Sequence, residues 1–224
     1  MDTRVICFSR SMSAGGDEIA RKVADKIRFR YVDDEIIIMA AEKEGVSPIT
    51  IGKVERSNPI IDRILGSMSH NNPKQEEKGG GSYQITNSKL SQSEGYRQII
   101  QDVIVETAKM GKVVIVAHGA SILLSEMSGI LRVFVTSSQS NRTKRHMSTS
   151  NLDEQKARED IAASDRQRKD YFRNFYNVDQ ELPTQYDIVL NTDHLTLSIA
   201  VDVVVGVAKK LKTDKYEPSQ DARG

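Results

Sequence analysis

Five short apolar runs along the chain predict buried β-strands. They are rich in valine and isoleucine and show little polar alternation, which is typical of strands covered on both faces. They span residues 4–8, 29–32, 113–117, 131–135 and 187–190, and the second is the weakest. Helical periodicity at about 17–27, 94–110 and 196–211 falls between them. This βαβ alternation predicts an α/β fold of three layers, with a parallel sheet between two layers of helices.

The first strand leads into a segment with the layout of a phosphate-binding loop. Small residues follow the strand, and a helix with apolar positions at a period near 3.6 comes next. Backbone N–H groups and the positive end of a helix dipole hold phosphate at such a turn, so the main chain must approach the oxygens closely. The candidate phosphate-binding residues are Ser13, Ala14, Gly15, Gly16 and Asp17. A glycine turn before an acidic first helical turn is an equally weighted structural interpretation.

This loop departs from the motif G-x-x-x-x-G-K-[ST] at the positions that carry its chemistry. With Gly15 as the second glycine, Gly16 stands at the lysine position, Asp17 at the hydroxyl position and Arg10 at the first glycine. The lysine of the motif contacts the β- and γ-phosphates, and its hydroxyl contacts magnesium. Carboxylates at a helix N-terminus repel phosphate unless a cation lies between them. We therefore expect Asp17 to approach Mg²⁺ and Arg10 to supply part of the missing positive charge.

Four groups of residues together resemble the cytidylate kinase-like group of P-loop nucleotide kinases. They are Ser9-Arg10 with residues 13–16, then residues 31–37, residues 113–120, and residues 165–168 with Phe175-Tyr176 and 190–192. The resemblance covers most of the chain and depends on the order and spacing of these groups. It implies a P-loop kinase fold with a helical lid and a substrate-side insertion. It also implies transfer of the γ-phosphoryl group of ATP, with Mg²⁺, to a nucleoside monophosphate or similar small acceptor.

The length of 224 residues suits a single domain, which we divide by this resemblance. The core comprises residues 1–32, 96–136 and 178–211, and residues 33–95 form an insertion on the acceptor side. Residues 137–177 form a basic lid region, and residues 212–224 a flexible tail. Within the insertion, residues 66–93 are polar and rich in glycine, serine and asparagine, which predicts a flexible excursion.

Composition narrows the class of protein further. The single cysteine, Cys7, excludes an intramolecular disulfide and lies in the first apolar strand, where a buried thiol is expected. A net charge of +1, from 32 basic and 31 acidic residues, gives no indication of a nucleic-acid partner. No apolar stretch is long enough for a signal peptide or membrane span, so we expect a cytoplasmic protein without a membrane partner. The sequence does not indicate an oligomeric state.

Arginines of the lid region are the main catalytic candidates. Phosphoryl transfer is catalysed by positioning and by positive charge on the equatorial oxygens, and one well-placed arginine can change the rate by about 10³–10⁵. Helical spacing allows each of two groups of basic side chains to converge on one anion. The candidates are Arg142, Arg145, Arg166 and Arg168, together with Arg10 of the loop. A solvated helix face, with Glu159, Asp160 and Asp170 as ion-pair partners, is the alternative for each of them.

The remaining candidates bind the acceptor and the adenine base. His118 follows the third strand, where the family usually has Gly-Arg, and either contacts substrate or makes a structural hydrogen bond. Arg63 is a candidate for the acceptor phosphate. The resemblance places Asn191 and Thr192 beside the adenine base.

Three hypotheses of function remain open at this point. The first is a kinase of the cytidylate kinase type. The second is a catalytically degenerate nucleotide-binding regulator, which the missing lysine and hydroxyl favour. The third is an interaction domain that keeps only the fold. Retention of a basic lid region favours the kinase, because binding alone has little need for so many arginines.

Overall fold

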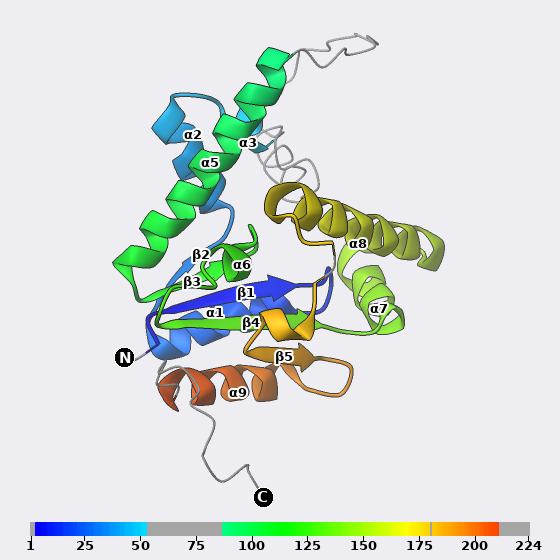
Figure 1. Cartoon of the computed structure of the whole chain (residues 1–224). Coiled ribbons are helices and arrows are strands. Elements are labelled where there is room, and N and C mark those ends of the chain that lie inside the picture. The colour runs from blue at the N-terminus through cyan, green and yellow to red at the C-terminus, as the bar shows by residue number, and fades with distance from the viewer. Residues whose placement is uncertain (1–2, 53–86, 180, 211–224) are drawn as a thin grey trace, which may run out of the picture.

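The fold is built on one parallel five-stranded sheet (Figure 1). The computed structural model describes residues 3–52, 87–179 and 181–210. The strands are β1 (Val5–Arg10), β2 (Arg30–Val32), β3 (Val113–Val116), β4 (Ile130–Thr136) and β5 (Ile188–Asn191). They pair in parallel in the order β2-β3-β1-β4-β5, with Val5 of the central strand opposite both Val113 and Ile130. All five apolar runs are therefore strands, and the predicted α/β class is confirmed.

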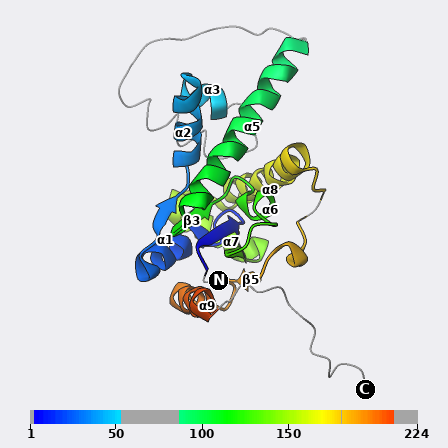
Figure 2. The ribbon, with the colours of Figure 1, turned by 60° about the vertical axis from the view of Figure 1, so that its left-hand side comes forward.

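Helices cover both faces of the sheet, so the domain has three layers (Figures 1 and 2). On one face, α1 (Gly16–Ile27) packs beside α9 (Leu197–Lys210). On the other face lie α2 (Glu35–Glu44), α3 (Pro48–Gly52), α5 (Asn87–Met110), α6 (Ala120–Leu123) and α8 (Glu154–Tyr176). The helix α7 (Gln139–Ser150) packs against α8, beyond the carboxyl ends of the strands (Figure 1). A 3₁₀ turn, η1 (Pro183–Gln185), precedes β5.

The pleat of β1 explains why this strand is apolar throughout. Val5 and Cys7 pack in the hydrophobic cluster below α5 and α8, whereas Ile6 and Phe8 pack in the cluster below α1 and α9. Successive side chains of a strand point to opposite faces, so a strand buried on both faces must be apolar at every position. Burial raises the pKa of the Cys7 thiol to about 12, so this cysteine is a structural residue of the core.

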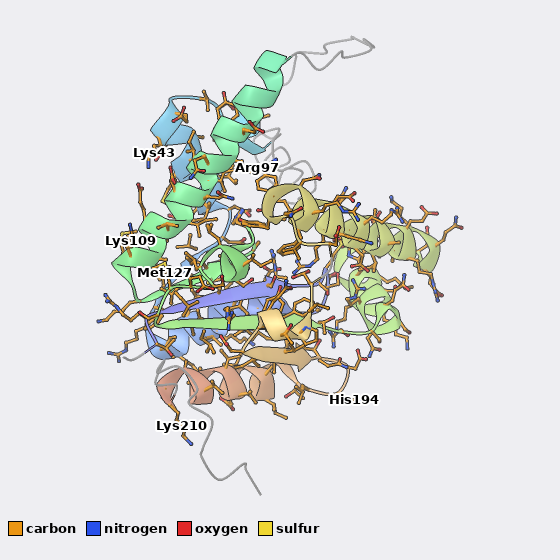
Figure 3. The ribbon with its side chains drawn as sticks, in the orientation of Figure 1. Lys43, Arg97, Lys109, Met127, His194 and Lys210 are labelled. Atoms are coloured by element: carbon orange, nitrogen blue, oxygen red, sulfur yellow. The ribbon has the colours of Figure 1, made fainter. Side chains whose placement is uncertain are left out.

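The C-terminal half of α8 docks into the core through aromatic side chains. Tyr171, Phe172 and Phe175 are buried, and the rings of Tyr171 and Phe175 stack with their centroids 4.4 Å apart. Arg97 of α5, labelled in Figure 3, lies over the Phe175 ring at 4.8 Å. These aromatic contacts anchor the C-terminal half of α8 to the core.

One expectation about a helix boundary is corrected. The helix expected from residue 94 begins at Asn87, so residues 87–93 are helical and do not belong to a flexible excursion. These residues are polar, so their sequence does not indicate a helix. The C-terminal part of α5, where Ile100 and Ile104 are fully buried, packs against the core and stabilises the whole helix. The rest of the excursion, Arg63 and the tail lie outside the described residues. In the part of the chain that the structure describes, no helix is long and apolar enough to cross a membrane.

Candidate functional site

The turn between β1 and α1 brings the main chain close to its neighbours. Ser13 and Gly15 adopt left-handed backbone conformations, with φ of 59° and 83°. A Cβ atom on Gly15 would lie 2.8 Å from Cδ2 of Leu197, and one on Gly16 would lie 2.6 Å from Cβ of Arg10. Glycine is thus required at position 16 by close packing and at position 15 mainly by its positive φ. The first turn of α1 leaves backbone N–H groups without intrahelical acceptors, as an anion site requires.

A cleft of about 870 Å³ opens between this loop and the helices α7 and α8. Of the predicted site residues, seven line it: Arg10, Ser13, Gly15, Gly16, Asp17, His118 and Arg168. Others among the described residues do not: Ala14, Arg142, Arg145, Arg166, Asn191 and Thr192. The structure therefore joins the loop, one acceptor candidate and one lid arginine in a single cavity at the carboxyl ends of β1 and β3. This is where parallel sheets bind ligands.

Arg10 is a buried cation whose charge is already compensated. Its side chain is 11% exposed and forms an ion pair with Asp17, and its Nη2 lies 3.9 Å from Oδ2 of Asp33. Burial lowers the pKa of the Arg10 guanidinium, but the carboxylates of Asp17 and Asp33 raise it more, so the net shift is upward. Arg10 stays protonated at every physiological pH, and a phosphate must compete with Asp17 for it.

Arg168 joins the lid region to the entrance of the loop. Its Nη1 donates to the carbonyl oxygen of Arg10 over 2.8 Å, and its Nη2 donates to Oγ of Ser9 over 2.7 Å. The same guanidinium holds both carboxylate oxygens of Glu181, at 2.5 and 2.7 Å. These bonds use the fork geometry that only arginine provides. The structure gives Arg168 the surroundings of a positioning residue.

Tyr186 completes this network from the turn before β5. Its hydroxyl donates to Oε1 of Glu181, and its oxygen lies 3.1 Å from Oγ of Ser9. Burial, and then the charge of Glu181, raises the pKa of the Tyr186 phenol, so the hydroxyl keeps its proton. The sequence does not point to Glu181 or Tyr186 as site residues. Their partners lie up to 177 residues away, and no local pattern signals such a contact.

Arg142 and Arg145 of α7 have different partners in this structure. Arg142 is buried and makes a bidentate pair with Asp165, with distances of 2.9 and 2.8 Å. Arg145 donates to the hydroxyl of Thr192 over 2.8 Å and to its carbonyl oxygen over 2.5 Å. Arg166 is exposed on α8. These arginines do not converge on one point here, although helical spacing allows it, because α8 and the loop after β5 supply closer acceptors.

The segment after β5 buttresses the loop and α7. Thr192 is buried, and its hydroxyl donates to the carbonyl oxygen of Ala14 over 2.8 Å. Asn191 is exposed and accepts from the backbone N–H of Asp193 over 3.0 Å. Asp193 in turn accepts from Ser137, Ser138 and Asn141 at the start of α7. These donors, led by the Ser137 hydroxyl, lower the pKa of Asp193.

His118 sits in a run of three left-handed residues after β3. Ala117, His118 and Gly119 have φ of 68°, 53° and 65°. The His118 side chain is 1% exposed, and its Nε2 lies 3.2 Å from the carbonyl oxygen of Asp33. Tyr176 at the end of α8 donates to the carbonyl oxygen of His118 over 2.5 Å. The structural hydrogen bond that was one alternative for His118 is present, and the residue also lines the cleft.

Carboxylates at the loop suit a cation that arrives with phosphate. No cluster of three or more His, Cys, Asp or Glu side chains able to hold a metal occurs among the described residues. Mg²⁺ does not need such a cluster, because it is usually held by one or two carboxylates, waters and substrate phosphates. Asp17 lines the cleft with a side chain 44% exposed, and Oδ1 of buried Asp33 has no hydrogen-bond partner.

The parallel sheet, the loop at the N-terminus of α1 and the helices over its cleft define a P-loop kinase fold. A family model, the cytidylate kinase-like family, matches residues 5–194. The chain therefore belongs to the cytidylate kinase-like family.

Individual relatives are more distant. A cytidylate kinase of Pyrobaculum islandicum is 23% identical over 204 residues, which cover 89% of each chain. A uronate isomerase of Corynebacterium glutamicum is 27% identical over 149 residues, but the chain spans only 27% of that protein. A crystal structure of an uncharacterized protein from Eubacterium ventriosum shares the fold, with a TM-score of 0.63 at 15% identity, covering 93% of this chain and 99% of that one.

Proposed function

We propose that this protein is a nucleotide kinase that transfers the γ-phosphoryl group of ATP, with Mg²⁺, to a nucleoside monophosphate or a similar small acceptor. The observation that carries the proposal is the tightly packed Gly15-Gly16 turn at the N-terminus of α1, which faces an 870 Å³ cleft. Membership of the cytidylate kinase-like family supports a phosphotransferase activity.

In this proposal the backbone N–H groups at residues 13–16 bind the phosphates of ATP. Arg10 exchanges Asp17 for a phosphate oxygen, and Asp17 then faces the cation. Mg²⁺ would supply positive charge that neutralises the phosphates. In the full motif the lysine contributes part of that charge, and this chain lacks it. Arg168 keeps its hold on the carbonyl oxygen of Arg10, so the loop retains its shape while Arg10 changes partner.

The remaining candidates take their roles from the family resemblance. Arg142, Arg145 and Arg166 stabilise charge on the transferred group if α7 moves toward the cleft. His118 and Arg63 contact the acceptor, and Asn191 and Thr192 flank the base. Before that movement, Arg142 is paired with Asp165 and Arg145 with Thr192.

The test is calorimetric titration of ATP with and without Mg²⁺, followed by a transfer assay over the common nucleoside monophosphates. Magnesium-dependent binding with transfer to one acceptor is the expected result. Binding without transfer to any acceptor would contradict the kinase and support a regulator. An absence of binding would leave the fold without this function.

A further inference from the structure

A second group of polar side chains, from α7 and α8, lines the same cleft. His146 of α7 is 8% exposed, and its Nε2 lies 3.4 Å from Oδ2 of Asp160 on α8. Its Nδ1 lies 3.4 Å from Oγ of Ser150, at the end of α7. All three residues line the same cleft as the loop. They form a hydroxyl–imidazole–carboxylate series, which the sequence analysis did not identify.

Asp160 determines which nitrogen of His146 carries the proton. Lys156 lies 2.8 Å from Oδ1 of Asp160, and this contact, with that of His146, lowers the pKa of the carboxyl. An ionised carboxylate only accepts hydrogen bonds, so Nε2 carries the hydrogen and Nδ1 presents its lone pair to Ser150. This is the arrangement of an oriented base beside a nucleophile, in which distances are often long before substrate binds.

The neighbouring hydroxyls at the end of α7 are engaged with the backbone. Ser148 donates to the carbonyl oxygen of Arg145 over 3.0 Å. Thr149 donates to the same carbonyl over 2.9 Å and contacts that of His146 at 3.3 Å. The Ser150 hydroxyl instead faces a basic nitrogen, and its side chain is exposed to the cleft.

We propose that Ser150 is an activated nucleophile that accepts a phosphoryl group from the nucleotide bound in this cleft, so that the protein phosphorylates itself at this position. The nucleotide rests on the function proposed above. The Ser150 Oγ forms a bond to the γ-phosphorus, while the bond from that phosphorus to the β,γ-bridging oxygen breaks. ADP leaves with the electron pair. His146 Nδ1 takes the hydroxyl proton, and Asp160 stabilises the imidazolium.

The experiment incubates the full chain with Mg²⁺ and ATP and maps phosphorylated residues by mass spectrometry. We expect phosphoserine at 150, complete loss in Ser150→Ala and a loss of about 100-fold in rate in His146→Gln, the lower end of the range of general-base catalysis. Ser148→Ala, on the same helix end, is the matched control and should keep the wild-type rate. Modification at residue 148 or 149 in place of 150 would overturn the proposal.

A fluorophosphonate probe separates failure of this proposal from failure of the kinase. Such a probe phosphonylates activated serines with release of fluoride and needs no nucleotide site. Labelling of Ser150 that depends on His146, in a protein that does not bind ATP, would support the nucleophile and contradict the proposed kinase. ATP binding without either phosphoserine or probe label at 150 would overturn the nucleophile and leave the kinase standing.

Discussion

Arg168, on the lid helix α8, donates a hydrogen bond of 2.8 Å to the main-chain carbonyl oxygen of Arg10, which lies 158 positions earlier in the chain. The bond ties the start of the loop between β1 and α1 to the helix that covers the cleft. Glu181 fixes the other side of the same guanidinium. Movement of α8 must therefore either carry the loop with it or break a charge-assisted network.

Replacing Arg168 by alanine should destabilise the protein strongly. The substitution leaves Glu181, whose side chain is 13% exposed, without its cation and frees the Arg10 carbonyl. We expect a loss of about 2–4 kcal/mol in the free energy of unfolding, measured by urea denaturation. Arg158→Ala is the control, because Arg158 and Glu154 form an exposed pair at 59% each, and its cost should stay below about 0.5 kcal/mol. Equal costs for the two variants would contradict the network.

Replacing Gly15 by alanine should damage both the loop and its ligand binding. A left-handed residue with a side chain costs about 1–2 kcal/mol, and the end methyl of Leu197, 2.8 Å from the new Cβ, must also shift. Thermal unfolding and ATP titration measure the two effects. In Gly206→Ala, on α9, the new Cβ meets nothing within 4 Å and should raise stability by about 0.5–1 kcal/mol. A neutral Gly15→Ala would rule out the tight turn.

Replacing Asp17 by asparagine should make nucleotide binding less dependent on magnesium. The change removes the carboxylate that pairs with Arg10 and that repels phosphate in the absence of a cation. We expect ATP to bind severalfold more tightly without Mg²⁺, by about 1 kcal/mol, and to gain less from its addition. Calorimetry with and without Mg²⁺ measures the ratio. Glu18→Gln removes an equal charge that pairs with Lys22 at 2.6 Å, and should leave that ratio within about twofold. The same change of ratio in both variants would argue against the Arg10–Asp17 exchange.

Stability should fall in acid partly through Asp193. Its pKa is lowered in the folded state by the Ser137, Asn141 and Ser138 donors, so folding favours the ionised form. The stabilisation is complete above the pKa of an unfolded aspartate, near 3.9, and is lost as the pH falls from there toward the lower folded value. Urea denaturation at pH 5 and pH 3 should show a smaller decrease in Asp193→Asn than in the wild type. An identical decrease would mean that Asp193 titrates normally.

Much of the fold was predictable because its signals are local. Runs such as Val113–Val116 are apolar at every position, since both faces of the strand are covered. The turn at Gly15 was also predictable, since a run of small residues after a strand reports on its immediate surroundings. The early start of α5 was missed, because a polar first stretch of helix has no periodicity of its own.

The pairings of charges at the site were not predictable in the same way. The spacing of Arg10, Arg142, Arg145 and Arg168 made them candidates for an anion site, but nothing local shows that Asp17, Asp165, Thr192 and Glu181 hold them. The contacts of Arg142 and Arg145 join residues 23 and 47 positions apart. For the same reason the sequence did not indicate the contact between His146 and Asp160, which lie on separate helices.

The sequence by itself determined the α/β class, the glycine turn after the first strand and the family, because each depends on residue type and spacing along the chain. Only the tertiary structure decided which arginines face the cleft and which carboxylates neutralise them. The reason is physical. The sequence gives the charge of each side chain, but which partner it meets depends on how β1, α7, α8 and the segment around β5 pack together. Those crossings bring Ser9, Arg168 and Tyr186 into one network.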